Sequence, residues 1–489
     1  MNPPNWVNRT MWTGDNLDIM RGMNSESVDL IYLDPPFNSN RNYAAPIGSE
    51  AAGAAFKDTW TLDDVDLAWH GEIAEQHSAL YAIVDAARAS HGKGMQSYLI
   101  MMGVRLLEMW RILKRTGSIY LHCDTTASHY LKLAMDAVFG EKNFQNEVVW
   151  KRHKGRSDGK RFGRVHDTIL FYTKESTYTW NDVFDPLDPE YVQANYKFVD
   201  HLQHRFGPFM SDNLTGPGVT DGESGQAWRE VDPTASGRCW SVPLTGNYAR
   251  WVEENIIPNY RSIKSVHGRL DALQEHDLIL WPKKLGGMAR LKRYLAASRG
   301  AKINDVITNI LRVDPNSDEG TGYPTEKPLP LLEHIVRASS NADDIVLDPF
   351  CGCATACVAA EKAERQWIGI DLSPKAKDLV ELRLEKDLGM FGLETVYRTD
   401  FPNRTDVGEL PHYRTHKHTL FGKQEGLCNG CGHFFPFRNF TVDHILSRHR
   451  AGTDHIDNLQ LLCGACNSLK GTGTQEELIA RLKQQGIIN

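Results

Sequence analysis

Four residues, Asp34, Pro35, Pro36 and Phe37, bring a carboxylate, a rigid turn and an aromatic ring together. They follow the apolar run 28–33, which predicts a buried strand, so they fall where open α/β sheets place ligands. The two prolines fix φ and remove two N–H donors, which leaves carbonyl oxygens free to accept hydrogen bonds. Asp34 and the Pro35 carbonyl are placed to accept from one exocyclic amine, while Phe37 stacks on the base that carries it. An ordinary turn is the alternative for this tetrapeptide taken alone.

A second strand and turn have the features of a nucleotide-binding edge. The apolar residues 345–347 predict a strand, and the turn after them contains Gly352 and leads into a predicted helix. Such a turn directs backbone N–H groups and the positive end of the helix dipole toward an anionic or carboxylate-bearing ligand. The next predicted strand ends at Asp371, at the spacing of about 20 residues from which an acidic side chain accepts from two ribose hydroxyls. An ordinary βαβ unit without a ligand is the alternative.

The C-terminal region contains two cysteine pairs, Cys428-x-x-Cys431 and Cys463-x-x-Cys466, separated by 31 residues. Four thiolates in two such pairs form the usual ligand set of a tetrahedral structural zinc site. One Cys-x-x-Cys pair is compatible with redox chemistry, but two pairs in one short module favour zinc. Zinc binding would contribute on the order of 10 kcal/mol to a module that has little core of its own.

Polar residues between and after the cysteine pairs could hold a second metal ion. Asp443, His444, Asn458 and Asn467 offer a carboxylate, an imidazole and two carboxamides. Brought together, such groups can bind a divalent cation and activate a water molecule.

The elements that must position these residues alternate between helix and strand, which indicates an α/β sheet. From about 175 to 300 the pattern becomes irregular and rich in Gly, Pro, Asn, Trp and Tyr, which indicates an inserted, loop-rich subdomain. We expect a body of residues 1–395 that contains this insert, a polar linker at 396–420 and a compact module at 421–489. The predicted strands are 28–33, 118–122, 147–150, 168–172, 345–347 and 366–370, and the predicted helices are 17–23, 98–113, 328–339 and 354–362.

Length and composition describe a globular chain of 489 residues with two or three domains. The sequence has no basic-then-apolar leader and no apolar run near the roughly 20 residues of a membrane span, so we expect a cytoplasmic protein. The nine cysteines are an odd number spread over a long chain. They indicate reduced thiols or metal ligands rather than a disulfide framework.

The net charge of −7 counts against a nucleic-acid partner, but the basic residues are clustered. Residues 151–164 contain seven Lys or Arg and one Asp, with glycines between them and predicted strands on either side. We interpret this run as a loop that contacts phosphates. A second basic run has a solvated helix face as its alternative, since residues 289–299 have helical character. Its members are Lys283, Lys284, Arg290, Lys292, Arg293, Arg299 and Lys302.

Several motifs in order resemble the amino-group DNA methyltransferases of the permuted class, in which the catalytic motif precedes the cofactor motif. The resemblance covers roughly residues 10–395 and rests on the segments GDNLDIM, DLIYLDPPF, RTGSIYLHCD, EVVWKR, HDTILFYTK, YPTEKP, VLDPFCGCATA and WIGIDLS. It implies a Rossmann-like methyltransferase fold with S-adenosylmethionine as cofactor. It also implies that the irregular insert is the target-recognition region.

The resemblance assigns roles to the residues of the nucleotide-binding edge. The cofactor-binding residues that it implies are Asp348, Pro349, Phe350 and Gly352 near the methionine part, Asp371 on the ribose and Asp15 near the adenine. The family loop usually has a second glycine where this chain has Ala354. Because alanine tolerates positive φ poorly, we expect a reduced cofactor affinity, although Gly352 remains.

The resemblance also implies a mechanism at the Asp-Pro-Pro-Phe turn. The target base is flipped out of double-stranded DNA, at a cost of a few kcal/mol, and enters a pocket at Asp34. Asp34 and the Pro35 carbonyl orient the amine so that its lone pair faces the sulfonium methyl, and positioning supplies most of the rate. Adenine N6 is the favoured target because Asp opens the tetrapeptide, whereas Ser is commoner there among cytosine N4 enzymes. Cytosine stays an alternative.

The C-terminal constellation resembles the HNH nuclease ββα-metal fold. By this resemblance His444 is the general base, Asp443 and Asn467 bind a catalytic Mg²⁺ or Mn²⁺ ion, and Asn458 orients His444. Many family members have histidine at the position of Asn467, and asparagine is a familiar variant. The alternative is a zinc module that only binds DNA.

The sequence therefore predicts a site-specific DNA methyltransferase fused to an HNH endonuclease, with a role in restriction and modification. A solitary methyltransferase with a DNA-binding zinc module is the first alternative. An RNA methyltransferase is the second, although a nuclease would make little sense there. Permuted-class enzymes often pair, so a homodimer is a further expectation, and no membrane partner is expected.

Overall fold

The computed structural model describes residues 3–36, 41–44, 55–58, 73, 77–155, 159–282, 287–314, 326–389, 394–406, 413–450, 452, 454 and 456–488. The chain divides into two compact units, one of Met1–Asn181 with Asn304–Asn489 and one of Asp182–Ile303. None of the helices in the described residues is long and apolar enough to cross a membrane.

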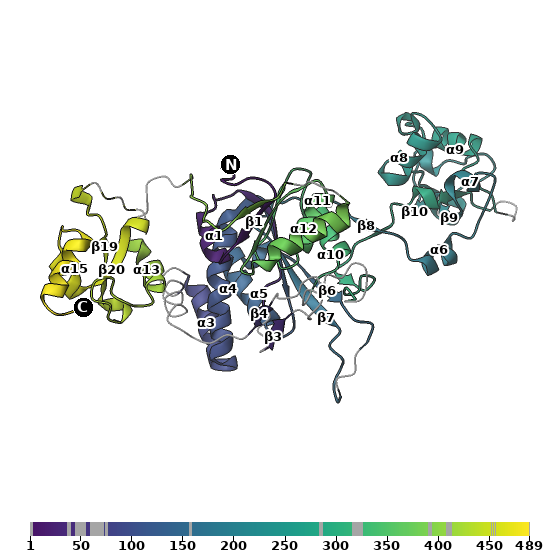
Figure 1. Cartoon of the computed structure of the whole chain (residues 1–489). Coiled ribbons are helices and arrows are strands. Elements are labelled where there is room, and N and C mark those ends of the chain that lie inside the picture. Colours follow the sequence, from purple (N-terminus) through teal and green to yellow (C-terminus); the bar gives the residue numbers. More distant parts are fainter. Residues whose placement is uncertain are drawn as a thin grey trace. The chain divides into compact units, whose positions relative to one another are not determined.

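Within the described residues, a nine-stranded sheet in the order β15-β6-β7-β5-β2-β16-β17-β1-β18 forms the centre of the first unit (Figure 1). The strands from β5 to β18 in this order pair in parallel, and β7 runs antiparallel between β5 and β6. The strands are β1 (Thr10–Thr13), β2 (Val28–Leu33), β5 (Leu113–Cys123), β6 (Phe144–Lys151), β7 (His166–Thr173), β15 (Val306–Ile307), β16 (Ile345–Asp348), β17 (Gln366–Asp371) and β18 (Val396–Arg398). The predicted α/β fold is confirmed.

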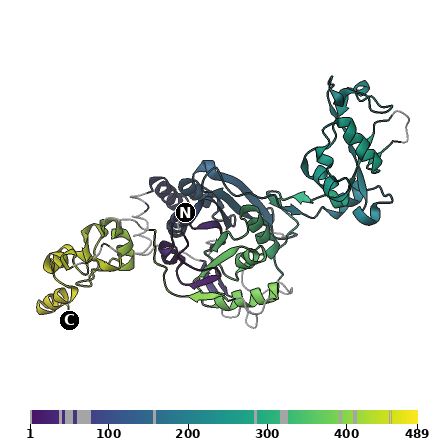
Figure 2. The same ribbon diagram turned by 90° about the horizontal axis from the view of Figure 1, so that it is seen from above.

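Helices cover both faces of this sheet. Figure 2 shows the two groups, coloured slate blue and green, on opposite sides. One face is covered by α1 (Asn16–Gly22), α3 (Ser78–His91), α4 (Lys93–Ile112) and α5 (Ser128–Phe139), and the other by α10 (Leu329–Ser339), α11 (Thr355–Lys362) and α12 (Lys375–Leu388). A short hairpin, β3 (Arg41–Ala44) with β4 (Ala55–Asp58), follows β2.

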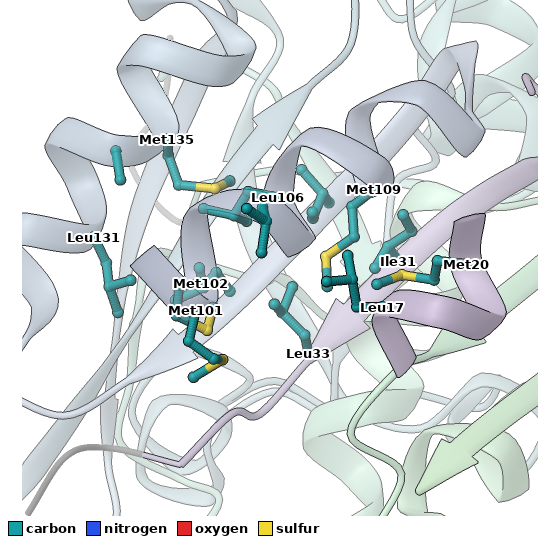
Figure 3. Close-up of a cluster of buried hydrophobic side chains, with 14 of the residues drawn as sticks. Leu17, Met20, Ile31, Leu33, Met101, Met102, Leu106, Met109, Leu131 and Met135 are labelled. Atoms are coloured by element: carbon teal, nitrogen blue, oxygen red, sulfur yellow. The ribbon is translucent and has the colours of Figure 1, made fainter. Parts of the chain in front are cut away.

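Alternation along β2 decides which core each side chain joins. Ile31 and Leu33 pack with the methionine-rich helix α4, as Figure 3 shows. Leu30 and Tyr32 pack in the other core, with α10 and α11. Because side chains alternate with a period of two, Asp34 continues the face of Tyr32 and lies on the side of α10 and α11.

The unit Asp182–Ile303 has its own aromatic core. The chain enters and leaves this unit through one antiparallel pair, β8 (Phe184–Asp185) with β14 (Ala301–Lys302). Gly300 adjoins this pair at φ 101°, and a Cβ there would lie 2.0 Å from the carbonyl oxygen of Asp185. The other elements are α6 (Pro189–Asn195), α7 (Gln203–Phe206), β9 (Phe209–Asn213), β10 (Thr215–Pro217), β11 (Arg238–Trp240), α8 (Gly246–Asn255), α9 (Val266–Glu275), β12 (Ile279–Leu280) and β13 (Arg290–Tyr294).

The helix face considered for the second basic run is wrong, because residues 290–294 form strand β13 in a sheet with β12 and β9. Lys292 is 5% exposed, and its ammonium pairs with Asp200 at 2.7 Å and Asp277 at 2.9 Å. Its charge is therefore already neutralised by carboxylates. Lys283 and Lys284 lie outside the described residues.

The C-terminal region forms a small ββα arrangement with a core of its own. Strands β19 (Phe440–His444) and β20 (Leu459–Cys463) pair in antiparallel, and α14 (Gly464–Lys470) and α15 (Gln475–Gln484) follow. Regular secondary structure begins before residue 421, where the module was expected to start, since α13 (Lys417–Lys423) lies partly within the predicted linker. His418 stacks on Phe437 with ring centroids 4.0 Å apart, a contact between distant segments that local composition does not reveal.

Candidate functional site

Four carboxylates lie at the carboxyl ends of neighbouring parallel strands. Asp34 directly follows β2, Asp348 and Asp371 end β16 and β17, and Asp15 follows β1 by two residues. Because β2, β16, β17 and β1 are consecutive in the sheet and pair in parallel, these ends meet at one edge. This is the edge at which open α/β sheets bind ligands.

The two oxygens of the Asp34 carboxylate have different surroundings, because one is in an ion pair and the other has no donor. Its Oδ2 accepts a hydrogen bond from Nζ of Lys327, whose side chain is 7% exposed. Its Oδ1 is buried and has no hydrogen-bond partner in the described part of the chain. A buried polar atom without a partner costs about 1–3 kcal/mol, which an entering N–H donor would recover. Pro35 is buried and Pro36 is half-buried, whereas Phe37 lies outside the described residues.

A buried cluster holds Lys327 in this position. The preceding residue, Glu326, forms an ion pair with Arg383 at 2.6 Å, and both side chains are buried. Arg383 also donates to the hydroxyl of Thr355 at 2.8 Å, and this hydroxyl donates to the carbonyl oxygen of Lys327 at 3.3 Å. Since Thr355 begins α11, the segment that carries the partner of Asp34 is fixed to the helix after the Gly352 turn.

Backbone N–H groups hold the carboxylate of Asp371. Gly352 donates to its Oδ2 at 2.8 Å, and Ser373 donates to its Oδ1 at 2.7 Å. Each oxygen keeps a second lone pair, so both can still accept from hydroxyl groups. Gly352 has φ 51°, which a glycine adopts without steric cost. Leu372 beside them is 76% exposed and offers an apolar surface to a ring.

Two acids at this edge, Asp348 and Asp371, retain their protons more strongly than a carboxyl group in water. Burial raises the pKa of Asp348 well above its usual value, a hydrogen bond from the N–H of Phe350 at 3.1 Å lowers it, and the charges of Asp34 and Asp371 raise it again. Burial also raises the pKa of Asp371. A cation placed among these groups would favour their ionised forms.

Arg105 connects Asp15 to the turn after β16. Oδ1 of Asp15 accepts from the N–H of Leu17 at 2.9 Å and from Nη2 of Arg105 at 2.8 Å. Nε of Arg105 donates to Oδ1 of Asn16 at 2.6 Å, and the amide of Asn16 donates to the carbonyl oxygen of Pro349 at 2.7 Å. The buried arginine of α4 therefore holds Asp15 directly and, through Asn16, the turn after β16.

Ala354 has φ 62° and ψ 26°, which is the left-handed region. This backbone costs an L-residue roughly 1–2 kcal/mol. The methyl group is fully buried, which contributes about 0.8 kcal/mol. Burial thus offsets part of the backbone cost, and a net cost of roughly 0.2–1.2 kcal/mol remains.

A buried polar network lies beside Tyr32 and so next to the Asp34 position. The hydroxyl of Tyr32 is 3.0 Å from Nδ1 of His122, and Nε2 of His122 is 3.3 Å from Oδ2 of Asp167. Arg152 pairs with Asp167 at 3.0 Å. Burial raises the pKa of Asp167, but the hydrogen bond from His122 and the charges of His122 and Arg152 lower it below its usual value. The network joins β2, β5 and β7 to the residue that follows β6.

The four cysteines of the C-terminal module converge. The sulfur atoms of Cys428, Cys431, Cys463 and Cys466 all lie within 4.8 Å of one another. A tetrahedral zinc ion with Zn–S bonds of about 2.3 Å needs sulfur atoms about 3.8 Å apart, so the residues fit this ion. Backbone N–H groups point at two of the sulfurs, for example that of Cys463 to Sγ of Cys428 at 3.2 Å, which favours thiolates.

The polar residues of the module lie around the pair β19 and β20. Nε2 of His444 is 2.9 Å from Oδ1 of Asp454, which also accepts from Nε of Arg448 at 2.7 Å. Arg448 and then His444 lower the pKa of Asp454 to about 2. The side chain of Asp443 pairs with Lys470 at 3.0 Å, and this fully buried lysine also donates to the carbonyl oxygen of His444 at 2.8 Å.

The two asparagines have different positions. Asn458 accepts from the N–H of Leu446 at 2.9 Å and donates to its carbonyl oxygen at 3.0 Å, so it clamps the turn directly after His444. Asn467 lies on α14, one helical turn before Lys470. Asp443 and Asn467 thus come from the strand and the helix of the ββα arrangement.

Comparison with protein families agrees with this geometry. Residues 28–382 match the N6/N4 methyltransferase family, described as DNA methylase, and residues 428–473 match the HNH endonuclease family. The chain is a DNA methylase of this family. The methylase carries a C-terminal HNH domain.

Relatives of the methylase come from restriction-modification systems and beyond. It is 28% identical over 368 residues to the type II methyltransferase M.EcaI of Enterobacter cloacae, covering 75% of this chain and 67% of the relative. It is 28% identical over 359 residues to the Mod subunit of the type III enzyme StyLTI of Salmonella typhimurium, covering 70% of this chain and 48% of the relative. It is 21% identical over 368 residues to the DNA adenine methyltransferase YhdJ of Escherichia coli, covering 75% and 79%. The methylase thus spans only about half the length of the StyLTI subunit.

The sequence predicts the acids of the methylase edge but not the basic side chains that pair with them. Nothing in the segment YPTEKP indicates that Lys327 pairs with Asp34, 293 residues away in the chain. Arg105 lay inside a helix that reads as apolar. In the HNH domain, Asp454 and Lys470 were missed, although both lie within or beside the stretch that holds the candidate residues.

Proposed function

We propose that the methylase transfers a methyl group from S-adenosylmethionine to an exocyclic amine of a base flipped out of double-stranded DNA. The unpartnered, buried Oδ1 of Asp34 carries this proposal, because it is an acceptor held ready for an N–H donor. Bound S-adenosylmethionine would supply an electrophilic methyl group on a sulfonium ion. Asp348 to Gly352 would contact its methionine part, Asp371 its ribose and Asp15 its adenine end.

The charges of the edge suit a cationic cofactor. Asp15 forms an ion pair with Arg105, and Asp34 forms one with Lys327. The carboxylates of Asp348 and Asp371 instead accept hydrogen bonds from backbone N–H groups. With all four acids ionised, the edge has an excess of two negative charges over its two basic partners. A sulfonium with an ammonium and a carboxylate has a net charge of +1, which this edge would stabilise.

The residues at Asp34 perform the transfer step by positioning. Lys327 keeps Oδ2 occupied, so the amine of the target base donates to Oδ1 and to no other atom of this carboxylate. The carbonyl oxygen of Pro35 accepts the second N–H, which turns the nitrogen lone pair toward the methyl group. The amine nitrogen would take the methyl group as the bond from that carbon to the sulfonium sulfur breaks, and the extra proton of the resulting cationic amine would pass to Oδ1. Holding the reacting atoms in line can supply several kcal/mol of the barrier reduction.

We favour adenine as the target base, and its N6 as the acceptor, because the relative YhdJ is named a DNA adenine methyltransferase; cytosine N4 is the second candidate. We further propose that the HNH domain cleaves DNA and that the chain unites modification and restriction. His444, oriented by Asp454, is the general base, and Asp443 and Asn467 hold the divalent ion.

The cysteine cluster holds a structural zinc ion. The nine free cysteines suit a reducing compartment such as the cytoplasm.

One incubation tests both activities. Purified protein, unmethylated plasmid, Mg²⁺ and labelled S-adenosylmethionine should give label in the DNA and strand breaks. His444→Ala should lower cleavage on the order of 100-fold or more and leave labelling unchanged, because it removes the general base. His449→Ala, at an exposed histidine of the same domain, is the matched control. Label without breaks from the intact protein would reduce the HNH domain to a DNA-binding module.

The affinity for S-adenosylmethionine should rise with pH, because of the carboxyl group of Asp348. Below the raised pKa of Asp348 its carboxyl is neutral and attracts a sulfonium weakly, so affinity rises as the pH increases through that pKa. The change should approach tenfold per pH unit, because binding then releases about one proton. The stability of the cofactor-free protein should change with pH in the opposite direction. The contribution of Asp348 to folding stability is fully present below the pKa that this carboxyl has in the unfolded chain. It is lost as the pH rises through the higher pKa of the folded protein.

Calorimetric titration with S-adenosylmethionine at a series of pH values above the usual range of a carboxyl group measures this dependence. Asp348→Asn should flatten it, because the amide does not titrate, while leaving the shallower contribution of Asp371. An equal dependence in Asp348→Asn would assign the effect to another group.

A further inference from the structure

The connection between β6 and β7 leaves the sheet at the edge that carries Asp34. β5 runs parallel to β2, and β7 runs antiparallel to both β5 and β6. β6 therefore ends, and β7 begins, at the edge where β2 ends. Figure 1 shows this connection, below the label β7, projecting from the body.

The stem of this connection is firmly held. The N–H of Arg152 donates to the carbonyl oxygen of Val165 at 2.9 Å, which continues the hairpin beyond the sheet. The guanidinium of Arg152 pairs with the buried Asp167 at 3.0 Å. The indole N–H of Trp150 donates to the carbonyl oxygen of Ile310 at 2.8 Å. The direction in which the hairpin leaves the sheet is thus fixed by contacts on three sides.

Phe162, beyond this stem, is almost wholly in water. Its exposed fraction is 99%, whereas the next most exposed large apolar side chain in the described residues is Leu372, at 76%. Single exposed apolar residues are common on protein surfaces. Phe162 differs because Lys160, Arg161 and Arg164 on either side of it are exposed as well. Among the residues that the structure describes, the Phe162 ring makes no contact with another aromatic ring and no cation–π contact.

A fully exposed ring among cations matches the chemistry of a nucleic-acid duplex. Lysine and arginine side chains contact phosphates, and the affinity that they supply does not depend on sequence. Apolar side chains inserted between base steps unstack them and bend the duplex. A base that leaves the stack for an active site opens a gap of one ring thickness, which an aromatic side chain can fill by stacking.

We propose that Phe162 inserts into the DNA duplex where the target base has been extruded and fills the gap in the base stack. The inference rests on the proposed function, because it requires a flipped base at Asp34. Lys160, Arg161 and Arg164 hold the two backbones on either side of the insertion. The ring lowers the free energy of the extruded state, so more of the bound DNA has its target base in the pocket.

The test compares Phe162→Ala with the intact methylase on duplex oligonucleotides that contain the plasmid site at which label is found. One duplex is fully paired, and the other has the target base opposite an abasic position, where extrusion breaks no base pair. Phe162→Ala should lower kcat/KM on the paired duplex on the order of 10- to 100-fold. On the abasic duplex the loss should fall to a few-fold, because the cost that the ring offsets is largely absent.

Two further variants separate stacking from charge. Phe162→Trp keeps an aromatic face and should stay within a few-fold of the intact protein on both duplexes. Lys160→Ala with Arg161→Ala should weaken binding equally on both duplexes and reduce its salt dependence. Leu133→Ala, at a half-exposed position of α5, is the surface control and should change nothing.

The outcomes distinguish the inference from the proposed function. A Phe162→Ala protein that matches the intact methylase on the paired duplex overturns the inference. An equal loss on both duplexes also overturns it, because the ring would then contribute to binding rather than to extrusion. If the intact methylase places no label in plasmid DNA, the proposed function fails first and the inference fails with it.

Discussion

Replacing Asp34 with alanine should lower single-turnover methyl transfer to DNA on the order of 100- to 1000-fold. The loss corresponds to one preorganised hydrogen-bonding group in a site that excludes water. Oδ1 is a buried acceptor with no hydrogen-bond partner among the described residues, so in the proposed function it is the atom that the amine contacts. The measurement is a rapid-quench assay with enzyme in excess over a labelled duplex.

The ion pair with Lys327 requires a control for Asp34→Ala. Removing Asp34 deprives the buried ammonium of Lys327 of its carboxylate, and breaking a buried ion pair costs about 3–5 kcal/mol, enough to unfold the site. Asp34→Asn with Lys327→Met removes both charges and keeps an amide oxygen as acceptor. This double variant should fold with near-normal cofactor affinity and regain part of the rate. A rate for Asp34→Ala within tenfold of the intact protein would remove Asp34 from the transfer step.

Removing the metal ligands of the cysteine cluster should unfold the HNH domain alone. Cys428→Ser with Cys463→Ser breaks both pairs, and structural zinc binding is worth on the order of 10 kcal/mol, comparable with the whole stability of a small domain. We expect loss of bound zinc, rapid proteolysis between residues 413 and 488 and no strand breaks. Methyl transfer should remain within a few-fold, because the sheet and its cores do not include these residues.

Zinc content by mass spectrometry and limited proteolysis check this expectation. Cys239→Ser, at a half-buried cysteine of the unit Asp182–Ile303, is the matched control and should keep its zinc. Treatment of the intact protein with a chelator should reproduce the proteolysis pattern. A double variant with unchanged protease resistance would show that the module folds without metal.

The sequence predicted those features that depend on short spacings. Strand β2 has β-branched and aromatic residues in one run, and the Cys-x-x-Cys pairs need only local geometry to present two thiols each. The turn at Gly352 combines a strand, a glycine and a helix within a few residues. Such local patterns survive in any tertiary context, which is why the fold class, Asp34 and Asp371 could be predicted from them, whereas the roles of Asp348 and Asp15 followed from the family resemblance.

Features that depend on distant partners could not be predicted. Residues 290–294 have charges and apolar residues at spacings that fit a helix as well as a strand, and pairing with β9 decides the outcome. Lys292 is buried because Asp200 and Asp277 reach it from other elements. In the same way, no local pattern around Lys327 indicates that its partner is Asp34.

The single antiparallel pair at the base of the unit Asp182–Ile303 makes that unit exchangeable. Because β8 and β14 bring the two chain ends together, the unit can be cut out and a different sequence spliced in without changing the distance that the body must bridge. Gly300 marks the junction, since any larger residue would collide with Asp185. If this unit is the target-recognition region that the family resemblance implies, recombination at the β8–β14 pair would supply new sequence specificities to one unchanged catalytic body.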